Sequence, residues 1–195
     1  MNKALILESI SKHISLTKKE EEYFISLLQG KKLKKKQFLV HENEFNKHTA
    51  FITKGCLRSY SIDRNGFEHI IQFAPPGWWI ADIASVISNQ PGKLNIDALE
   101  DSEMFMLSRE DQLTLFEKNP KFERFFRIIT ENSIAANSHR LIDYMGLTAQ
   151  ERYFTFCNRY PMLMQSLPQK QIAAYIGVTP EFLSKIKAEY LKKKK

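Results

Sequence analysis

The spacing of hydrophobic residues changes twice along the chain and divides it into three stretches. Residues 3–29 carry two short apolar groups, and Thr17 stands three residues before Glu20, as in a helix-capping box. This pattern predicts two short helices. Residues 34–107 show short alternating or aromatic-rich runs separated by turn residues, which predicts an antiparallel barrel or jelly roll. Beyond Ser108 the pattern is helical.

Local signals add detail to the predicted roll. The dipeptide Asn65-Gly66, between the runs GCLRSYSI and FEHIIQF, is favoured in type I′ hairpin turns. The segment WWIADIASVISN has a more helical rhythm, so one short helix is expected inside the roll. The basic run Lys31 to Lys36 is interpreted as a solvated connection into the first strand.

A long helix is predicted to begin at Asn119-Pro120. One of its stripes has the four-three spacing of a helix that packs against a parallel partner, at Phe122, Phe126, Ile129, Ser133 and Ala136. The stripe indicates a homodimer, and the alternative is that it packs only on its own domain. Gly146 then breaks the helix, Thr148 caps the next one (AQERYFTFCNRY), and Pro161 ends it. We therefore expect two domains, residues 1–145, with a dimerisation helix at about 120–145, and residues 146–195.

The segment 166–190, SLPQKQIAAYIGVTPEFLSKIKAEY, has the spacing of a helix-turn-helix. A first helix begins near Pro168 and ends at Gly177, where a left-handed glycine can reverse the chain. Thr179 is a good cap for a second helix that starts at Pro180 and runs to about Tyr190. The apolar stripe of the first helix comprises Ile172, Ala173 and Ile176. The alternative is an ordinary helical hairpin with a polar outer face.

The second helix of this motif has two different faces. Its predicted packing face comprises Phe182, Leu183, Ile186 and Tyr190. Its predicted outer face comprises Glu181, Ser184, Lys185 and Ala188. Glu181 could accept a hydrogen bond from a cytosine amino group, and Lys185 could donate one to guanine. Phosphate contacts are expected from Gln169, Lys170 and Thr179, and the full predicted DNA-binding set adds Pro180 and Lys187.

Charge and composition favour nucleic acid as the partner of this segment. The 195-residue chain has a net charge of +7, and residues 166–195 hold seven Lys or Arg against two acidic residues. The length and the 43% hydrophobic content allow one sizeable core and a small second one. No apolar run approaches the roughly 18 residues of a membrane span, so a cytoplasmic location is expected. Cys56 and Cys157 are expected to be small core residues, and no cofactor is predicted.

The order of jelly roll with internal helix, long helix and helix-turn-helix resembles the Crp–Fnr family of bacterial transcription regulators. The best-matched segments are KGCLRSYSIDRNGFEHIIQFAPPGWWIAD, AQERYFTF and QKQIAAYIGVTPEFLSKI. The resemblance implies an α+β fold with a cyclic-nucleotide-binding-like sensory domain. It also implies a homodimer, without enzymatic activity, that docks two recognition helices in successive major grooves of double-stranded DNA. RNA polymerase is a further partner that the resemblance allows.

Three departures from the family pattern bear on target and effector. Pro180 stands where many members carry a basic base-reading residue. Many members also continue into a β-hairpin wing, which is expected to be reduced or absent here. The terminal lysines 192–195 either take over the wing's backbone contacts or form a frayed tail. The cyclic-nucleotide-binding triplet Gly-Glu-Leu/Ile reads Ala81-Asp82-Ile83, and the arginine of the phosphate site is replaced in Gly92-Lys93-Leu94.

These replacements predict that cyclic AMP is not the effector, because a phosphate buried beside Asp82 would face a second negative charge. Lys93 could act as a point charge only. The effector is therefore unknown, and an apolar or aromatic ligand, or none, is expected. The residues expected to line any remaining cavity are Trp78, Trp79, Asp82, Asn89, Lys93, Asn137 and Ser138.

Two other function classes compete with a DNA-binding regulator. A cupin-like metal enzyme would need a His-x-His pair followed by Glu, whereas His41, His48 and His69 are scattered, so no metal site or catalytic residue is predicted. A ligand-sensing module that signals through protein contacts would leave the basic C-terminal segment unexplained. Salt-dependent binding to duplex DNA would separate these alternatives.

Overall fold

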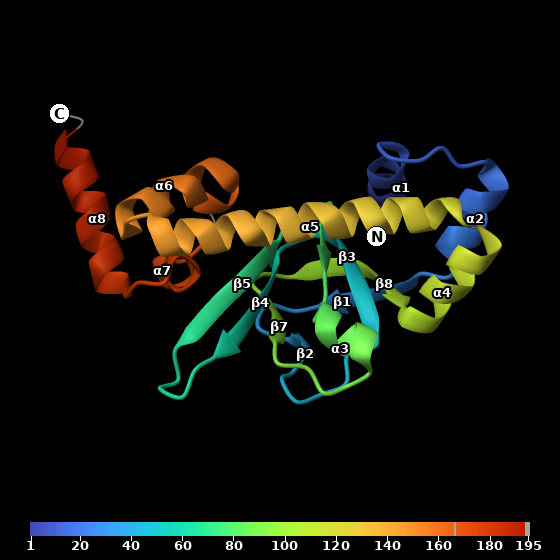
Figure 1. The fold of residues 1–195 in the computed structure, drawn as a ribbon, viewed down its shortest axis with the longest axis horizontal. Coiled ribbons are helices and arrows are strands. Elements are labelled where there is room, and N and C mark those ends of the chain that lie inside the picture. Colours follow the sequence, from blue (N-terminus) through green and yellow to red (C-terminus); the bar gives the residue numbers. More distant parts are fainter. Residues whose placement is uncertain (166, 194–195) are drawn as a thin grey trace. The chain divides into compact units, whose positions relative to one another are not determined.

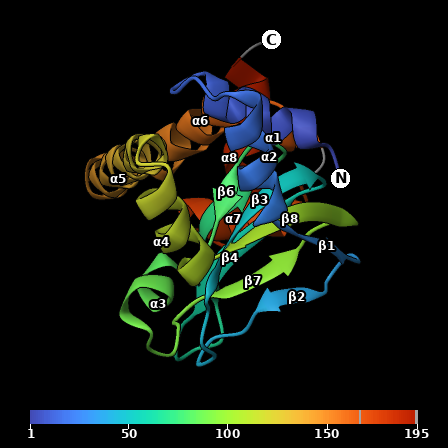
Figure 2. The same ribbon diagram turned by 90° about the vertical axis from the view of Figure 1, so that its right-hand side faces the viewer.

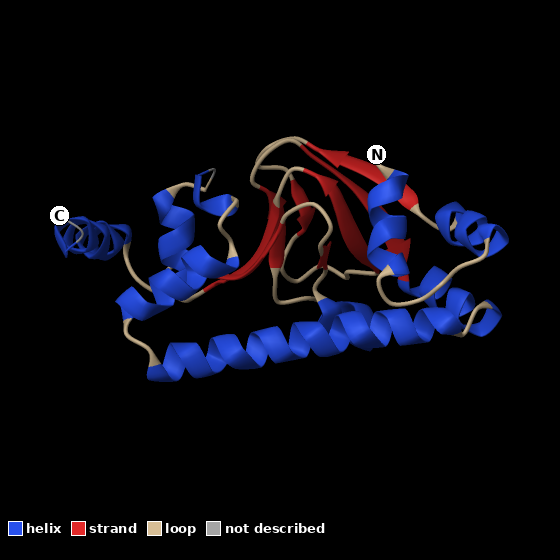
Figure 3. Ribbon diagram, turned by 90° about the horizontal axis from the view of Figure 1, so that it is seen from above, coloured by secondary structure: helices blue, strands red, loops and turns tan. Residues whose placement is uncertain are grey.

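The computed structural model describes residues 1–165 and 167–193, and the chain forms two compact units (Figure 1). The first unit holds residues 1–61 and 71–131, and the second holds residues 62–70 and the residues from 132 onward. The strands occur between residues 29 and 108, and the segments before and after them are helical (Figure 3). This order confirms the three stretches predicted from the hydrophobic pattern.

Eight strands of the described residues form two four-stranded sheets, in which β1 with β8, β3 with β8 and β6, and β7 with β2 and β4 pair antiparallel. The strands are β1 (Gln29–Leu33), β2 (Phe38–Val40), β3 (His48–Lys54), β4 (Leu57–Ile62), β5 (Glu68–Ala74), β6 (Trp79–Ile80), β7 (Asn95–Ala98) and β8 (Ser102–Ser108). One sheet has the order β1-β8-β3-β6 (Figure 2) and the other β2-β7-β4-β5. Two facing sheets in this order form a double-sheet jelly roll, as predicted.

The central strands β3 and β8 of the first sheet are buried on both faces, which explains why they lack simple apolar–polar alternation. Ala50 and Ile52 of β3 belong to the core between the sheets, together with Met104 of β8. Phe51 and Phe105, which point to the opposite face, belong to a second core formed with helices. Every position of β3 from Ala50 to Ile52 is therefore buried.

The helices of the second core are α1 (Lys3–Ser11), α2 (Lys18–Ser26), α4 (Arg109–Lys118) and the first part of α5 (Lys121–Gly146). Thr17 and Glu20 form the predicted capping box at the start of α2. Phe24 of α2 stacks on Phe122 of α5 with ring centroids 5.0 Å apart. The short helix predicted inside the roll is α3 (Ile83–Ser88).

Two predictions for the roll are wrong in detail. Lys31 and Lys32 lie in β1, where pairing with β8 requires a strand although their side chains stay exposed. Asn65 does not take the positive φ of a type I′ turn, and Gly66 alone does, with φ 82°. The Asp63 carboxylate accepts hydrogen bonds from the backbone N–H groups of Asn65 and Phe67 at 2.8 and 3.0 Å, which favours a turn built on Asp63.

The first half of the predicted dimerisation stripe packs within the first unit, so the alternative prediction holds there. Phe122 is fully buried, and Phe126 and Ile129 pack against the second core. Ser133 is exposed. The second half of α5 leaves a different set of large apolar side chains exposed: Ile134, Leu141, Ile142, Tyr144 and Met145.

The C-terminal helices belong to the second unit. They are α6 (Ala149–Arg159), the one-turn 3-10 helix η1 (Leu163–Gln165), α7 (Gln169–Ile176) and α8 (Pro180–Lys193). Thr148 and Glu151 form a capping box at the start of α6. The helix α5 ends at Gly146 and Thr148 caps α6, as predicted, while the domain limits 1–145 and 146–195 stay a prediction. Within the described ranges, no helix is both long and apolar enough for a membrane crossing.

Candidate nucleic-acid interface

The predicted helix-turn-helix is present as α7 and α8. Gly177 caps α7 in the left-handed conformation with φ 73°, and its backbone N–H donates to the carbonyl of Ala173. The N–H of Val178 donates to the same carbonyl at 3.0 Å. Thr179 caps α8, because its hydroxyl accepts from the N–H of Phe182 at 3.3 Å.

A small apolar core holds the two helices together. Ala173 is 1% exposed and Leu183 is fully buried, as the predicted packing faces require. Aromatic residues extend this core: the Phe156 ring of α6 lies 5.1 Å from the Tyr175 ring and 5.3 Å from the Tyr160 ring. Both predicted stripe isoleucines of α7 and the Ile186 side chain of α8 are also buried. The helix α8, whose outer side chains face solvent, is therefore fixed by a packed core on its inner face.

The outer face of α8 presents the predicted polar residues to solvent. Glu181, Ser184 and Lys185 are exposed, and so are Gln169, Lys170 and Thr179 nearby. The Ser184 hydroxyl lies 3.3 Å from Gln169 Oε1 and 2.9 Å from the Pro180 carbonyl. Pro180 and Lys187 are half-buried. The structure thus brings most of the predicted DNA-contacting residues onto one accessible face, while their contacts to DNA remain a prediction.

Glu181 is held as a carboxylate. Hydrogen bonds from its own backbone N–H and from Thr179 lower its pKa, at the N-terminal end of α8. An ionised carboxylate only accepts hydrogen bonds, so the group suits the predicted contact with a cytosine amino group.

One prediction for α8 is wrong. Phe182 is 49% exposed, whereas the packing-face residues Leu183 and Ile186 are 0% and 5% exposed. Phe182 therefore lies at the border of the packing face, while the two smaller aliphatic side chains are buried. The side chains of Tyr190 and of the terminal lysines 192–195 lie outside the described part of the structure. The packing role predicted for Tyr190 therefore stays a prediction.

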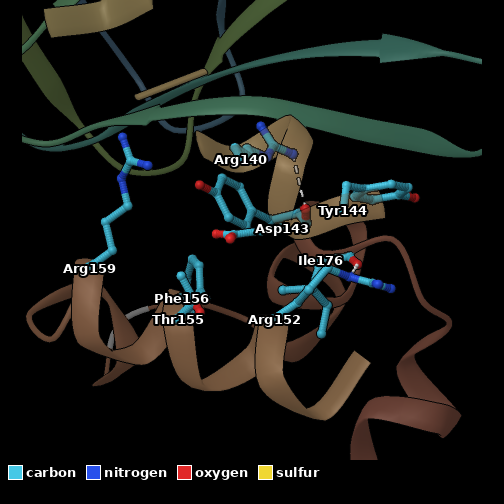
Figure 4. Close-up of a pocket in the computed structure, with 9 residues that line it drawn as sticks. Arg140, Asp143, Tyr144, Arg152, Thr155, Phe156, Arg159 and Ile176 are labelled. Atoms are coloured by element: carbon cyan, nitrogen blue, oxygen red, sulfur yellow. Dashed lines mark hydrogen bonds between the residues drawn. The ribbon is translucent and has the colours of Figure 1, made fainter. Parts of the chain in front are cut away.

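Two arginines that the sequence did not single out hold the end of α7 (Figure 4). Arg152 of α6 donates to the carbonyls of Ile176 and Leu147 at 2.9 and 2.8 Å. Arg140 of α5 donates to the Tyr175 carbonyl at 3.0 Å and also to the Ile70 carbonyl. Cations at the negative C-terminal end of a helix stabilise it. The carbonyl end of α7 is therefore bound by α5 and α6.

Aromatic rings complete this arginine junction. The Arg140 guanidinium lies 4.0 Å above the Tyr175 ring, and the Arg152 guanidinium lies 4.8 Å above the Tyr144 ring. The positive φ of Gly177 favours glycine there, and a Cβ atom at this position would also meet the Tyr144 ring. The cavity between these residues has a volume of about 30 Å³, room for a few waters at most. The junction is packed rather than a ligand site.

Asp82, predicted to line a ligand cavity, is 3% exposed and makes hydrogen bonds within the first unit. Its Oδ2 accepts from the backbone N–H groups of Lys93 and Leu94 at 2.8 and 3.1 Å. Its Oδ1 accepts from the N–H of Ser85 at 3.3 Å and so caps α3. A Cβ atom on Gly92 would lie 2.5 Å from Oδ2, which explains the glycine at this position.

The other residues predicted to line a ligand cavity differ in burial and position. Trp79 packs edge-on against Phe51 and Phe126, with ring centroids 5.3 and 5.4 Å apart, and acts as a core residue. Trp78 is 37% exposed. Asn89 ends α3 in the left-handed conformation, and the side chain of Lys93 is exposed. Asn137 and Ser138 are exposed residues of α5 in the second unit.

The histidines do not assemble a metal site in the described part of the chain. No three His, Cys, Asp or Glu side chains gather there in a way that could hold a metal ion. Cys56 is 3% exposed, as expected for a core residue, whereas Cys157 is only half-buried. Burial raises the pKa of the Cys56 thiol to about 12.

Residues 30–119 match the family model of the cyclic nucleotide-binding domain. The solved structure of FixK2 from Bradyrhizobium japonicum is similar to this chain at 19% identity, with 85% of each chain covered and a TM-score of 0.73. The c-di-GMP-responsive global regulator CLP from Xanthomonas campestris reaches a TM-score of 0.75 at 9% identity, covering 91% of this chain and 93% of that one.

A protein of Eubacterium rectale assigned to the Crp–Fnr family reaches a TM-score of 0.70 at 11% identity, covering 91% of this chain and 85% of that one. None of the curated proteins matches the sequence significantly. These likenesses confirm the Crp–Fnr fold that the sequence resembles.

Proposed function

We propose that this chain, which has the Crp–Fnr fold and a cyclic nucleotide-binding domain at residues 30–119, is a homodimeric, sequence-specific DNA-binding transcription regulator. The observation that carries the proposal is the outer face of α8. Glu181, Ser184 and Lys185 are exposed near its N-terminal end, on a helix fixed by packing against α7. That end of a recognition helix meets base edges in the major groove. The chain acts in the cytoplasm and not as an enzyme.

The second half of α5 supplies a surface for the partner copy. Ile134, Leu141 and Met145 are 59%, 62% and 81% exposed, and with Ser138 they follow a four-three-four spacing. This spacing fits a parallel helix pair better than a lone helix in water. We call Ile134, Ser138, Leu141 and Met145 the seam. It begins beyond Phe122, Phe126 and Ile129 of the predicted stripe, because these three side chains pack in the first unit.

The surroundings of Asp82 support control by something other than cyclic AMP. Family members grip the phosphate at the position of Gly92-Lys93-Leu94, where the N–H groups of Lys93 and Leu94 donate here to the Asp82 carboxylate. An incoming phosphate would have to displace this buried carboxylate and lie beside its charge.

Genome-wide capture of bound DNA tests the function directly. The proposal expects enrichment of a two-fold symmetric site with half-sites about one helical turn apart, 10–10.5 base pairs centre to centre. A matched capture with Ile134→Glu and Leu141→Glu in α5 is expected to lose the enrichment, because charges in the seam oppose dimerisation. Uniform recovery of DNA without a shared site would contradict sequence-specific regulation, and recovery of single half-sites would contradict the dimer.

A further inference from the structure

Phe182 is an exposed aromatic side chain on the helix proposed to enter DNA. It is the third residue of α8, and 49% of its surface is exposed. Its backbone N–H donates to the capping hydroxyl of Thr179, which fixes the start of the helix around it. The ring therefore stands at a defined place without being used by the core.

The neighbours of Phe182 on the helix surface are exposed polar residues of the proposed interface. Lys185 follows it by three residues and Thr179 precedes it by three, so both lie beside it on the helix surface. A long side chain on a helix leans toward the N-terminus of that helix. The Phe182 ring is thus directed toward the end of α8 that meets base edges.

The chemistry of the ring limits what it can recognise in the groove. A phenyl ring neither donates nor accepts a conventional hydrogen bond, and it is a poor partner for a phosphate. The apolar group that duplex DNA presents in the major groove is the C5 methyl of thymine, and phenylalanine is among the residues that contact it. Covering this methyl would also remove the exposed part of the ring from water.

We propose that Phe182 is a specificity-determining residue that contacts a thymine methyl next to the bases read by Glu181 and Lys185. This inference rests on the proposed function, since it requires α8 to lie in the major groove. It assigns α8 one apolar contact in addition to two polar contacts. Each half-site should then contain a thymine that cannot be replaced without loss of affinity.

Removal of single methyl groups from the DNA tests this contact. The captured site is prepared with each thymine replaced in turn by uracil, which keeps base pairing and removes only the C5 methyl. Dissociation constants are measured by fluorescence anisotropy for the full-length chain and for Phe182→Ala. For the wild type we expect about a fourfold loss at one thymine per half-site, the effect of one buried methyl group. For Phe182→Ala the same replacement should have no effect.

Two further variants separate the contact from a change in folding. Phe45→Ala removes a phenylalanine that is 57% exposed in the first unit, and this variant should keep the wild-type response to every uracil. Phe182→Leu keeps an apolar side chain and should retain part of the methyl sensitivity. Both Phe182 variants should keep the wild-type helical circular dichroism, because the packing residues Leu183 and Ile186 are unchanged.

The outcomes distinguish this inference from the proposed function. If the wild-type chain binds the site but no uracil weakens it, or if Phe182→Ala shows the wild-type uracil pattern, the thymine contact is wrong and the regulator remains. An equal loss for all sequences in Phe182→Ala would also overturn it, because a backbone contact carries no sequence information. If the wild type binds no duplex, the proposed function itself fails.

Discussion

At the scale of the residue, the buried Asp82 side chain connects two segments of the first unit. Asp82 is 3% exposed, and its carboxylate accepts three backbone hydrogen bonds, from Ser85, Lys93 and Leu94. This carboxylate holds the loop at residues 92–94 to the start of α3, and under the proposed function it stands where a cyclic nucleotide would place its phosphate.

Cyclic AMP should therefore not bind the chain at micromolar concentration. Isothermal titration calorimetry together with tryptophan fluorescence is expected to show no saturable signal. The phosphate would have to displace the Asp82 carboxylate from its backbone N–H donors and leave it buried without partners. Lys93→Ala serves as the matched variant and should behave as the wild type does. Saturable micromolar binding that is lost in Lys93→Ala would show that the site accepts the phosphate after all.

A second residue, Glu20, makes the stability of the helices in the first unit depend on pH. Glu20 forms an ion pair with Lys121 of α5 at 2.8 Å and accepts from Thr17. The hydrogen bond from Lys121, followed by those from Thr17, lowers the pKa of Glu20 from 4.5 to about 2. A folded-state pKa below the unfolded value means that the stabilisation is present above pH 4.5 and is lost as pH falls toward 2.

Acid titration followed by circular dichroism tests this linkage. We expect the free energy of unfolding to fall with pH between about 5 and 2, and to fall less in Glu20→Gln, which cannot lose the charge. Glu22→Gln, a change at an exposed acid of the same helix, should follow the wild-type curve. Identical pH dependence in Glu20→Gln and the wild type would remove Glu20 as a source of acid sensitivity.

At the scale of elements, the arginine junction determines how firmly α7 is held. Arg152 binds the carbonyls of Ile176 and Leu147 and lies 4.8 Å above the Tyr144 ring. Without the guanidinium, partly buried carbonyl groups at the end of α7 and of α5 would lose their donors. A lost partner of this kind costs about 1–3 kcal/mol.

Arg152→Met should therefore loosen α7 locally. Hydrogen–deuterium exchange is expected to speed up in residues 169–178, by the factor that corresponds to about 1–3 kcal/mol of local opening. Arg127→Met is the matched control, because Arg127 forms an exposed i,i+4 pair with Glu131 and should contribute about 0.5 kcal/mol at most. Unchanged exchange in α7 of Arg152→Met would show that the junction contributes nothing to its stability.

Elements with local signals were predictable from the sequence, and those fixed by distant partners were not. Thr17, Thr148 and Thr179 mark helix starts, and Gly177 marks a turn, because capping and positive φ depend on neighbouring residues. The strand β1 was missed because its apolar content is low and pairing with β8 creates it. Contact residues such as Arg140 depend on tertiary packing that periodicity does not encode.

In the candidate interface too, features with local sequence signals were predictable and those that depend on tertiary packing were not. The exposed face of α8 was predicted from helical periodicity, which correctly placed Glu181, Ser184 and Lys185. The same periodicity places the apolar Phe182 on the packing face, although 49% of its surface is exposed. Whether a residue at the border of a helix face is covered depends on tertiary packing, which here buries Leu183 and Ile186 but not Phe182.

At the scale of the whole molecule, charge is distributed unevenly along the chain. Residues 166–195 carry a net charge of +5 out of the total of +7, while the rest of the chain is close to neutral. A protein that neutralises phosphates releases counterions, so its affinity for DNA falls steeply with salt. The account therefore requires that binding energy comes largely from this segment and is sensitive to ionic strength.

The dependence of duplex affinity on salt concentration tests the central claim most directly. Fluorescence anisotropy with the captured site should show affinity falling by about a thousandfold or more between 50 and 200 mM salt if six or more phosphates are contacted. Lys170→Ala should reduce the slope of log affinity against log salt by about one. Lys12→Ala, at an exposed lysine of the first unit, should leave it unchanged. Absence of duplex binding at low salt, or an affinity that salt does not alter, would contradict the account.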